Sequence, residues 1–361
     1  MSSSLSCSSK SSASRRLDFI LEGQAMGIYE LDNEQAYQAE VSQCVGVTGY
    51  HQWFFLSAMA EALNLKFSAF GVEFEGRRLG VVPMLFRRHG PVSTVNNLPI
   101  GCIGPLIRGE ALRAGLVREL LAGVEPVLRE HRTIATRWAF SPGLNVSSEH
   151  LAMPGFEVSQ WENYVIPATK SVDDCLKSMA RQRRQSIRQS EGRGLSVGES
   201  SIDEITRWLP EQLATAYERL GEEPLYKPAE VRLLAERLAT HPRMLWRTVK
   251  AADGSVLGMT GCVIGNDRLW GWLMVGPPVP GISPQTLCYW DAINWSLSRG
   301  LAYDLGGIPN EGIRKLKVSL GADPEAAVVA IRVRPRAAYK AGMALYRGMN
   351  RIAKRRNGNT S

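Results

Sequence analysis

The order of expected helices and strands repeats along the chain, and this repeat constrains the fold more than any other feature. In the first half, a helix over 50–64 leads to two strands within 66–88 and then to a helix over 110–130 and a strand over 133–140. In the second half, helices over 202–219 and 228–239 lead to three antiparallel strands within 245–276, a helix over 284–299 and a strand over 301–305. The repeat predicts a duplicated α+β unit, and 361 residues suit about two domains.

The expected boundaries follow from this repeat and from composition. We expect a disordered, serine-rich N-terminus over 1–22, a first domain over 23–155 and a second domain over 156–345. The end of a basic helix and a tail occupy 346–361. The two central sheets should meet near residues 155–165.

Cysteine and histidine usage narrows the possible chemistry. Six cysteines form no CxxC pair and have no histidines at metal-ligand spacing, so we expect reduced, mostly buried thiols, no metal site and a cytoplasmic protein. No run approaches 18 consecutive apolar residues, which predicts no membrane-spanning helix. The serine-rich start is not a secretory signal, although it could be a weak targeting segment.

The stretch YDLGGIPNEGIRKLKVSLGAD over 303–323 is the strongest candidate for a site. A short strand carries Asp304, the pair Gly306-Gly307 forms a turn, and a short helix follows. On a helical wheel Lys315 points to solvent, whereas Lys317 lies beside the apolar stripe, at the edge of a crevice. Lys317 could also lay its stem over the core with its head in water. A glycine turn ahead of a helix can present backbone N–H groups to an anion.

Two segments concentrate positive charge. A helix over 171–190 would place Lys177, Arg181, Arg184 and Arg188 in one stripe, and like charges at such spacings repel each other. Residues 331–361 hold nine Lys or Arg and no Asp or Glu, and a helix over 336–355 would carry a second basic stripe. Both stripes suit a polyanionic partner, such as tRNA, and the second also suits an anionic membrane surface. Either stripe could instead be a solvated face.

The second half resembles the Fem family of aminoacyl-tRNA-dependent peptidyltransferases and the Fem-like acyltransferases. The resemblance rests on the Asp304–Gly307 turn, on Gly312, Lys317 and Gly321, and more weakly on Trp53, Pro83 and Gly101 to Pro105 in the first half. It covers roughly residues 25–345. Leu316 stands where the family usually has an aromatic residue. The resemblance implies an α+β fold with tandem GNAT-like domains, whose mixed and mostly antiparallel sheets are flanked by helices.

The resemblance also implies roles for single residues. Lys317 would stabilise the oxyanion of an acyl transfer, and Asp304 would orient it or the incoming amine, although Asp304 could equally be a turn or cap residue. The donor or its phosphates would contact Lys177, Arg181, Arg184, Arg188, Gly306, Gly307 and Arg314. Tyr217, Tyr226 and Trp272 would line an acceptor groove, although such aromatics are often core residues.

The expected activity is amide formation by transfer of an acyl or aminoacyl group to an amine acceptor in cell-wall, polysaccharide or secondary-metabolite synthesis. The co-substrate would be acyl-CoA or aminoacyl-tRNA, with no tightly bound cofactor. The pyrophosphate loop typical of acetyl-CoA enzymes is expected to be absent or remodelled over 275–287, because three prolines precede Gly281 and proline has no N–H to donate. The protein would be cytoplasmic, or peripheral at the inner membrane surface. The alternative is an inactive nucleic-acid-binding protein with the same fold.

Overall fold

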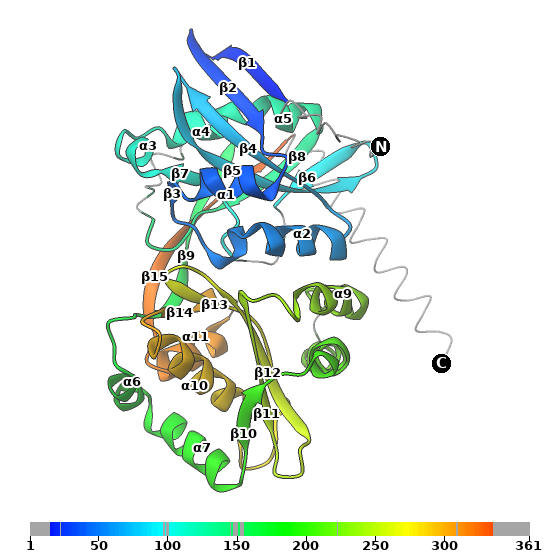
Figure 1. Cartoon of the computed structure of the whole chain (residues 1–361), viewed down its shortest axis with the longest axis vertical. Helices are drawn as coiled ribbons and strands as arrows, with labels where there is room; N and C mark the ends of the chain where they lie inside the picture. The colour runs from blue at the N-terminus through cyan, green and yellow to red at the C-terminus, as the bar shows by residue number, and fades with distance from the viewer. Residues whose placement is uncertain are drawn as a thin grey trace, which may run out of the picture.

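The computed structural model describes residues 15–334, except for positions 22, 97, 99–100, 145, 147–150, 152–154, 222 and 308–309. The chain forms two halves stacked along the long axis, with the N-terminal half above the C-terminal half in Figure 1. Residues 1–14 of the serine-rich start and the predicted basic helix over 336–355 lie outside the described residues. The expected disorder over 1–22 was wrong for its last part, because residues 16–21 pair as a strand with residues 24–29. In the described part of the chain no helix is both long and apolar enough to cross a membrane.

The first half is a twisted sheet with helices on both faces. Its strands, in chain order, are β1 (Arg16–Leu21), β2 (Gln24–Glu30), β3 (Cys44–Val45), β4 (Lys66–Phe74), β5 (Arg77–His89), β6 (Val92–Val95), β7 (Leu106–Arg108) and β8 (Thr133–Ala139). Its helices are α1 (Glu34–Val41), a short 3₁₀ turn (Gly49–His51), α2 (Trp53–Ala62), α3 (Gly109–Arg113), α4 (Val117–Gly123) and α5 (Glu125–Glu130).

The β4–β5 hairpin forms where it was predicted, because Glu75 and Gly76 both adopt the left-handed conformation that such a turn requires. The prediction of one continuous helix over 110–130 was wrong, because the segment forms three helices, α3, α4 and α5. Gly115, at a φ of 72°, separates the first two.

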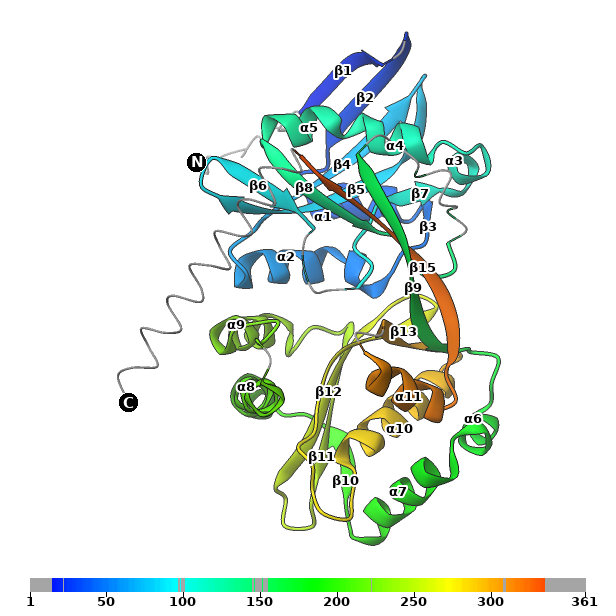
Figure 2. The ribbon, with the colours of Figure 1, turned by 180° about the vertical axis from the view of Figure 1, so that it is seen from behind.

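The second half repeats the arrangement. Its strands are β9 (Phe156–Ile166), β10 (Ser196–Glu199), β11 (Met244–Lys250), β12 (Val256–Ile264), β13 (Arg268–Val275), β14 (Ala302–Gly307) and β15 (Asp323–Val333). Its helices are α6 (Val172–Ser178), α7 (Arg181–Gly192), a π-helical turn (Glu204–Trp208), α8 (Leu209–Leu220), α9 (Pro228–Leu238), α10 (Pro284–Leu297) and α11 (Glu311–Ser319). Helices α10 and α11 cover one face of the sheet and α8 and α9 the other (Figure 2).

Each half contains one parallel strand pair that is reached through helices. Strand β6 pairs with β8 in the first half, and β13 pairs with β14 in the second. Every other ladder is antiparallel in the described sheet, which runs β1-β2-β4-β5-β6-β8-β15-β9-β14-β13-β12-β11-β10. The predicted mixed, mostly antiparallel fold class is therefore confirmed.

The halves are joined by a strand that crosses from the second to the first, which the sequence did not reveal. Strand β9 opens the second half and pairs with β14, whereas β15 closes the second half but pairs with β8 of the first. Strands β9 and β15 also pair with each other over ten positions, so the seam lies at 156–166 (Figure 1). A hydrophobic cluster shared by α2, α8, α9, β12 and β13 adds a second contact between the halves.

Candidate active site

Strands β13 and β14 pair at only three positions, ending with Trp270 opposite Asp304, and no further pairing joins them. Beyond Asp304 the chain turns at Gly306, whose φ of 79° suits glycine. Helix α11 then begins at Asn310, whose side chain accepts a hydrogen bond from the N–H of Ile313. The turn and the helix that carry the sequence-predicted residues thus lie beside the point where the two strands stop pairing.

Lys317 is the most buried residue of α11, with an exposed fraction of 3%. Its ammonium donates to the carbonyl oxygens of Gly306 and Gly307, each at 2.7 Å. The ammonium group of Lys317 is therefore buried. The alternative, in which the stem lies over the core and the ammonium group is in water, is wrong. Burial lowers the pKa of Lys317 to about 8, while the charge of Asp304 acts in the opposite direction. Lys315, on the same helix, is exposed as predicted.

Asp304 is 1% exposed and accepts hydrogen bonds from three directions. Its Oδ1 accepts from the N–H of Gly306 at 2.7 Å, and its Oδ2 accepts from Asn163 Nδ2 at 2.5 Å and Arg268 at 3.3 Å. Burial raises the pKa of Asp304 to about 6, and Arg268 is the largest of the groups that oppose this rise. Asp304 is thus a buried carboxylate that accepts from the Gly306 N–H, while Lys317 donates to the carbonyls of the same turn.

This arrangement changes the expected role of the glycine pair. The N–H of Gly306 is already bonded to Asp304, and both carbonyls face Lys317, so the Gly306 N–H is not free for a phosphate. Arg314, a second predicted donor contact, bonds to the Tyr164 hydroxyl at 3.2 Å and lies 3.5 Å from Glu162. The turn is braced from inside by a lysine and an aspartate rather than held open as an anion cradle.

The basic stripe over 177–188 differs from the prediction. The expected single helix was wrong, because Met179 and Ala180 are extended and divide it into α6 and α7. Lys177 therefore lies in the last turn of α6, with its ammonium 3.9 Å from Asp174, while Arg184 turns back to donate to the carbonyls of Lys177 and Met179. Arg184 closes the open end of α6, a local role that spacing alone does not reveal. Arg181 and Arg188 remain exposed on α7.

The aromatic candidates lie near the contact between the halves. Tyr226 is buried in the shared hydrophobic cluster, and Trp272 packs against that cluster with its ring 5.1 Å from Phe55. Tyr217 lies on α8 and is half-buried. None of the three borders the cavity that lies between the halves.

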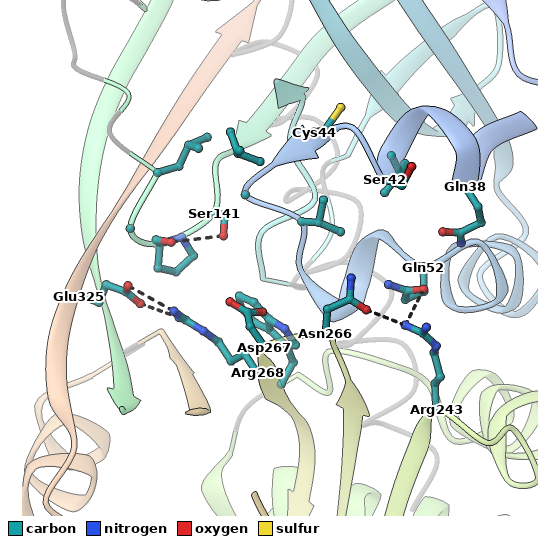
Figure 3. A pocket seen from close by; sticks show the side chains of 18 residues that line it. Gln38, Ser42, Cys44, Gln52, Ser141, Arg243, Asn266, Asp267, Arg268 and Glu325 are labelled. Carbon is teal, nitrogen blue, oxygen red and sulfur yellow. Dashed lines mark hydrogen bonds and ion pairs between the residues drawn. The ribbon is translucent and has the colours of Figure 1, made fainter. Parts of the chain in front are cut away.

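That cavity measures about 720 Å³ and lies between α1, β3 and the Ser141–Leu144 loop on one side and the β12–β13 turn on the other. Figure 3 shows Arg268 beside Glu325 on one wall, joined at 2.6 Å, and Arg243 facing Asn266 and Gln52 on the other. Arg268 also reaches Asp304, so one guanidinium joins the cavity wall to the braced turn. The cavity volume suits a small-molecule ligand.

Sequence reasoning missed Asn163, Arg268 and Glu325, the groups that surround Asp304. They come from β9, β13 and β15, which are far apart in the chain. A charged residue at the start of an apolar strand, as in DRLWGW, resembles a turn residue, so no local signal identified Arg268. Within the described ranges, no cluster of three or more His, Cys, Asp or Glu could hold a metal ion.

The loop over 275–287 also has an internal structure. Val279 and Ile282 form an isolated bridge, and Arg193 from the end of α7 donates to the carbonyl of Pro280 at 3.1 Å. Helix α10 then starts with Ser283 as its cap. The prolines and Arg193 together fix the conformation of this loop, and the loop does not present a row of free backbone N–H groups to a pyrophosphate.

Comparison with known proteins identifies the fold. Residues 177–318 match the family model described as an acetyltransferase (GNAT) domain. The crystal structure of FemX aligns with a TM-score of 0.66 at 13% identity, covering 86% of this chain and 98% of that one. Residues 177–318 thus match a GNAT domain, and the chain as a whole has the fold of FemX.

Two further solved structures share this fold. The tandem GNAT protein from the clavulanic acid biosynthesis pathway aligns with a TM-score of 0.50 at 14% identity, covering 85% of this chain and 98% of that one. L-PGS from Bacillus licheniformis aligns with a TM-score of 0.51 at 12% identity, covering 85% of this chain and 94% of that one. No curated protein matches at significant sequence similarity. The Fem-like fold predicted from the sequence is therefore confirmed.

Proposed function

We propose that this Fem-like protein is an N-acyltransferase that moves an acyl or aminoacyl group from an ester or thioester donor to an amine acceptor. The observation that carries the proposal is the turn at Gly306-Gly307, which is held between the buried Asp304 and the buried Lys317 beside the end of the β13–β14 pairing. The GNAT domain match over 177–318 supports an acyl-transfer reaction and includes both residues.

In the proposed reaction the acceptor nitrogen attacks the donor carbonyl carbon and forms the new C–N bond. The C–O bond of an ester, or the C–S bond of a thioester, then breaks, and the leaving oxygen or sulfur takes up the proton that the amine gives up. The charged Lys317 has three N–H groups, two of which are held by Gly306 and Gly307. The third is available to stabilise the carbonyl oxygen as it becomes negative. Asp304 acts as a positioning residue for the turn.

For the donor we favour aminoacyl-tRNA over acyl-CoA. The fixed loop over 275–287 offers little to a pyrophosphate, and Arg181 and Arg188 present exposed charge on α7 that suits an RNA backbone. The crystal structure of the clavulanic acid pathway protein is described as being without AcCoA, which connects that protein with a CoA thioester. The likeness to this protein is the observation that favours the alternative donor.

The acceptor is an amine-bearing small molecule or cell-envelope precursor that reaches the site from the space between the halves. The cavity of about 720 Å³ supports this assignment because Arg268 joins its wall to Asp304. The groove assigned to Tyr217, Tyr226 and Trp272 stays a prediction, as does a cytoplasmic or membrane-peripheral location through the basic C-terminal segment.

A donor assay tests the proposal. Purified protein is incubated with a small-molecule lysate fraction and either charged tRNAs or acyl-CoAs, and mass spectrometry detects the amide products. We expect products with charged tRNA. Products with acyl-CoA alone would replace the donor assignment, and products with neither would reject the transferase proposal in favour of the binding-protein alternative.

The salt dependence of donor affinity provides a second measurement. Binding of tRNA should weaken steeply with salt, by a slope of about 0.7–0.9 for each phosphate contact. Arg181→Ala combined with Arg188→Ala should flatten this slope by about 1–2, since each arginine would contact about one phosphate. Arg113→Ala combined with Arg118→Ala removes the same charge from exposed positions in the first half and should leave the slope unchanged. Equal effects of the two pairs would show that α7 is not the tRNA contact.

A further inference from the structure

A second cavity, of about 470 Å³, lies in the first half, where the start of β4, the β5–β6 hairpin and the connection from α5 to β8 come together. None of the residues assigned to the acyl-transfer site borders it. The cavity is therefore a separate feature of the molecule, and its lining gives an independent indication of what it binds.

Three cationic side chains meet at this cavity from three separate segments. Lys66 begins β4, Arg88 lies near the end of β5, and Arg132 lies in the connection between α5 and β8. Across the described residues, none of the three has a carboxylate within ion-pair distance. Glu130, the acid at the rim, is already engaged, because both of its oxygens accept from Arg15, at 2.9 and 2.7 Å. The one acidic residue that lines the cavity is thus already paired with Arg15, and the three cations of the lining outnumber it.

The backbone at Arg132 gives a second observation. Arg132 has a φ of 48°, in the left-handed region, and its N–H donates to the carbonyl of Arg129 to close α5. Glycine is the residue that suits this position, because a side chain there crowds the backbone. The structure describes four non-glycine residues with positive φ, and two of them, Asn64 and Arg132, border this one cavity. An arginine held in an unfavourable conformation at a binding surface is typical of a functional side chain.

Two rings, those of Phe86 and His131, also line the cavity. The ring of His131 lies 4.2 Å from that of Phe86. Burial is the main cause that lowers the pKa of His131, with Lys66, Arg88 and Arg15 acting in the same direction and Glu130 against it. The imidazole is therefore neutral near pH 7 and leaves the three longer cations to set the charge of the cavity.

We propose that this cavity binds a phosphate group, in the form of a phosphomonoester or free phosphate dianion. Guanidinium groups match phosphate oxygens in pairs, and the lysine adds a point charge beside them. A dianion neutralises more of the gathered charge than a carboxylate does. This site is independent of the acyl-transfer reaction, so its test requires no turnover.

Calorimetric titration of the full-length protein with inorganic phosphate, at low ionic strength and in a phosphate-free buffer, tests the proposal. Wild type should bind, and Arg132→Gly should weaken the affinity tenfold or more. The same substitution should raise the melting temperature of the phosphate-free protein by about 1–2 °C, because glycine relieves the left-handed residue. A residue with only a structural role would not combine lost binding with gained stability.

Asn64→Gly is the matched control, since it relieves a left-handed residue at the same cavity without changing the charge. It should leave phosphate affinity unchanged. Lys66→Gln combined with Arg88→Gln should weaken binding at least as much as Arg132→Gly does. Failure of wild type to bind phosphate at millimolar concentration, or equal affinity in wild type and all variants, would overturn the proposal.

Three further titrations distinguish the sources of the phosphate. They use a nucleoside monophosphate, glycerol 3-phosphate and vesicles that contain phosphatidic acid. Binding that is tighter than that of inorganic phosphate and is lost in Arg132→Gly identifies the source. If none of the three binds more tightly than inorganic phosphate, the site is assigned to free phosphate.

Discussion

Each half contains one parallel strand pair, but the residues at the last paired position differ between the halves. The last paired position of the β6–β8 ladder joins Val95 to Thr136, and that of the β13–β14 ladder joins Trp270 to Asp304. The Thr136 hydroxyl is buried and has no hydrogen-bond partner in the described residues, whereas Asp304 accepts from three groups. The same architecture therefore supports a plain packing position in one half and a charged network in the other, so the fold by itself does not make the site.

The difference extends to the strands at the seam between the halves. Beside β8, strand β15 brings Arg332, which pairs with Glu125 of α5. Beside β14, strand β9 brings Asn163, which donates to Asp304. Each half thus buries polar groups at its seam, but only the second half directs them to a turn that a lysine also braces.

The largest expected effect comes from removing that lysine. Lys317→Met should lower turnover by about 10²–10³, the typical effect of losing an oxyanion-stabilising group. It should also lower the free energy of unfolding by about 1–3 kcal/mol, since two buried carbonyls lose their donor. Turnover and denaturant unfolding measure the two effects. Lys315→Met, on the exposed side of α11, is the control and should change neither, so equal losses in the two variants would refute the assignment of Lys317.

The comparison between the halves is tested directly by changing its two equivalent positions. Asp304→Asn should lower the free energy of unfolding by about 1–3 kcal/mol, because its amide group would meet donors where an acceptor is needed. Turnover should fall with it. Thr136→Val removes a hydroxyl that has no partner and should change stability by less than about 1 kcal/mol in either direction, with normal turnover. Similar losses in both variants would mean that the halves do not differ as described.

A smaller and graded effect is expected from pH. The pKa of Asp304 is raised to about 6, so this carboxylate gains a proton as the pH falls through that value and no longer holds Gly306 and Arg268 as an anion. The pKa of Lys317 is lowered to about 8, so the ammonium loses its charge as the pH rises through that value. Turnover should therefore peak between pH 6 and 8. The profile of Thr136→Val should match that of wild type, and a flat profile from pH 5 to 9 would argue against both roles.

Part of the site was predictable from the sequence. The glycine turn, the short helix after it and the exposure of Lys315 follow from local propensity and helical periodicity, and the structure has all three. The helical wheel placed Lys317 at the edge of the apolar face but did not predict that it is fully buried. A wheel describes a single helix and does not include the glycine turn that covers this side chain. The break at Met179 and Ala180 was missed, since neither residue is a proline or glycine that would signal it. There the Met179 side chain is buried and the Ala180 N–H donates to the carbonyl of Ser319, a residue distant in the chain.

The sequence by itself therefore predicted most of the local elements and the repeated α+β order, and its family resemblance gave candidate residues for an acyl transfer. The elements and their order depend on interactions between residues close in the chain, where periodicity and turn chemistry act. Only the tertiary structure decided the crossing of β15 to the first half, the partners of Asp304 and the role of Arg184. Asn163, Arg268 and Glu325 reach Asp304 directly or through Arg268, from strands up to 162 positions apart, and no local propensity specifies such contacts. Strand pairing and burial specify them, because a buried carboxylate must find its donors wherever the fold places them.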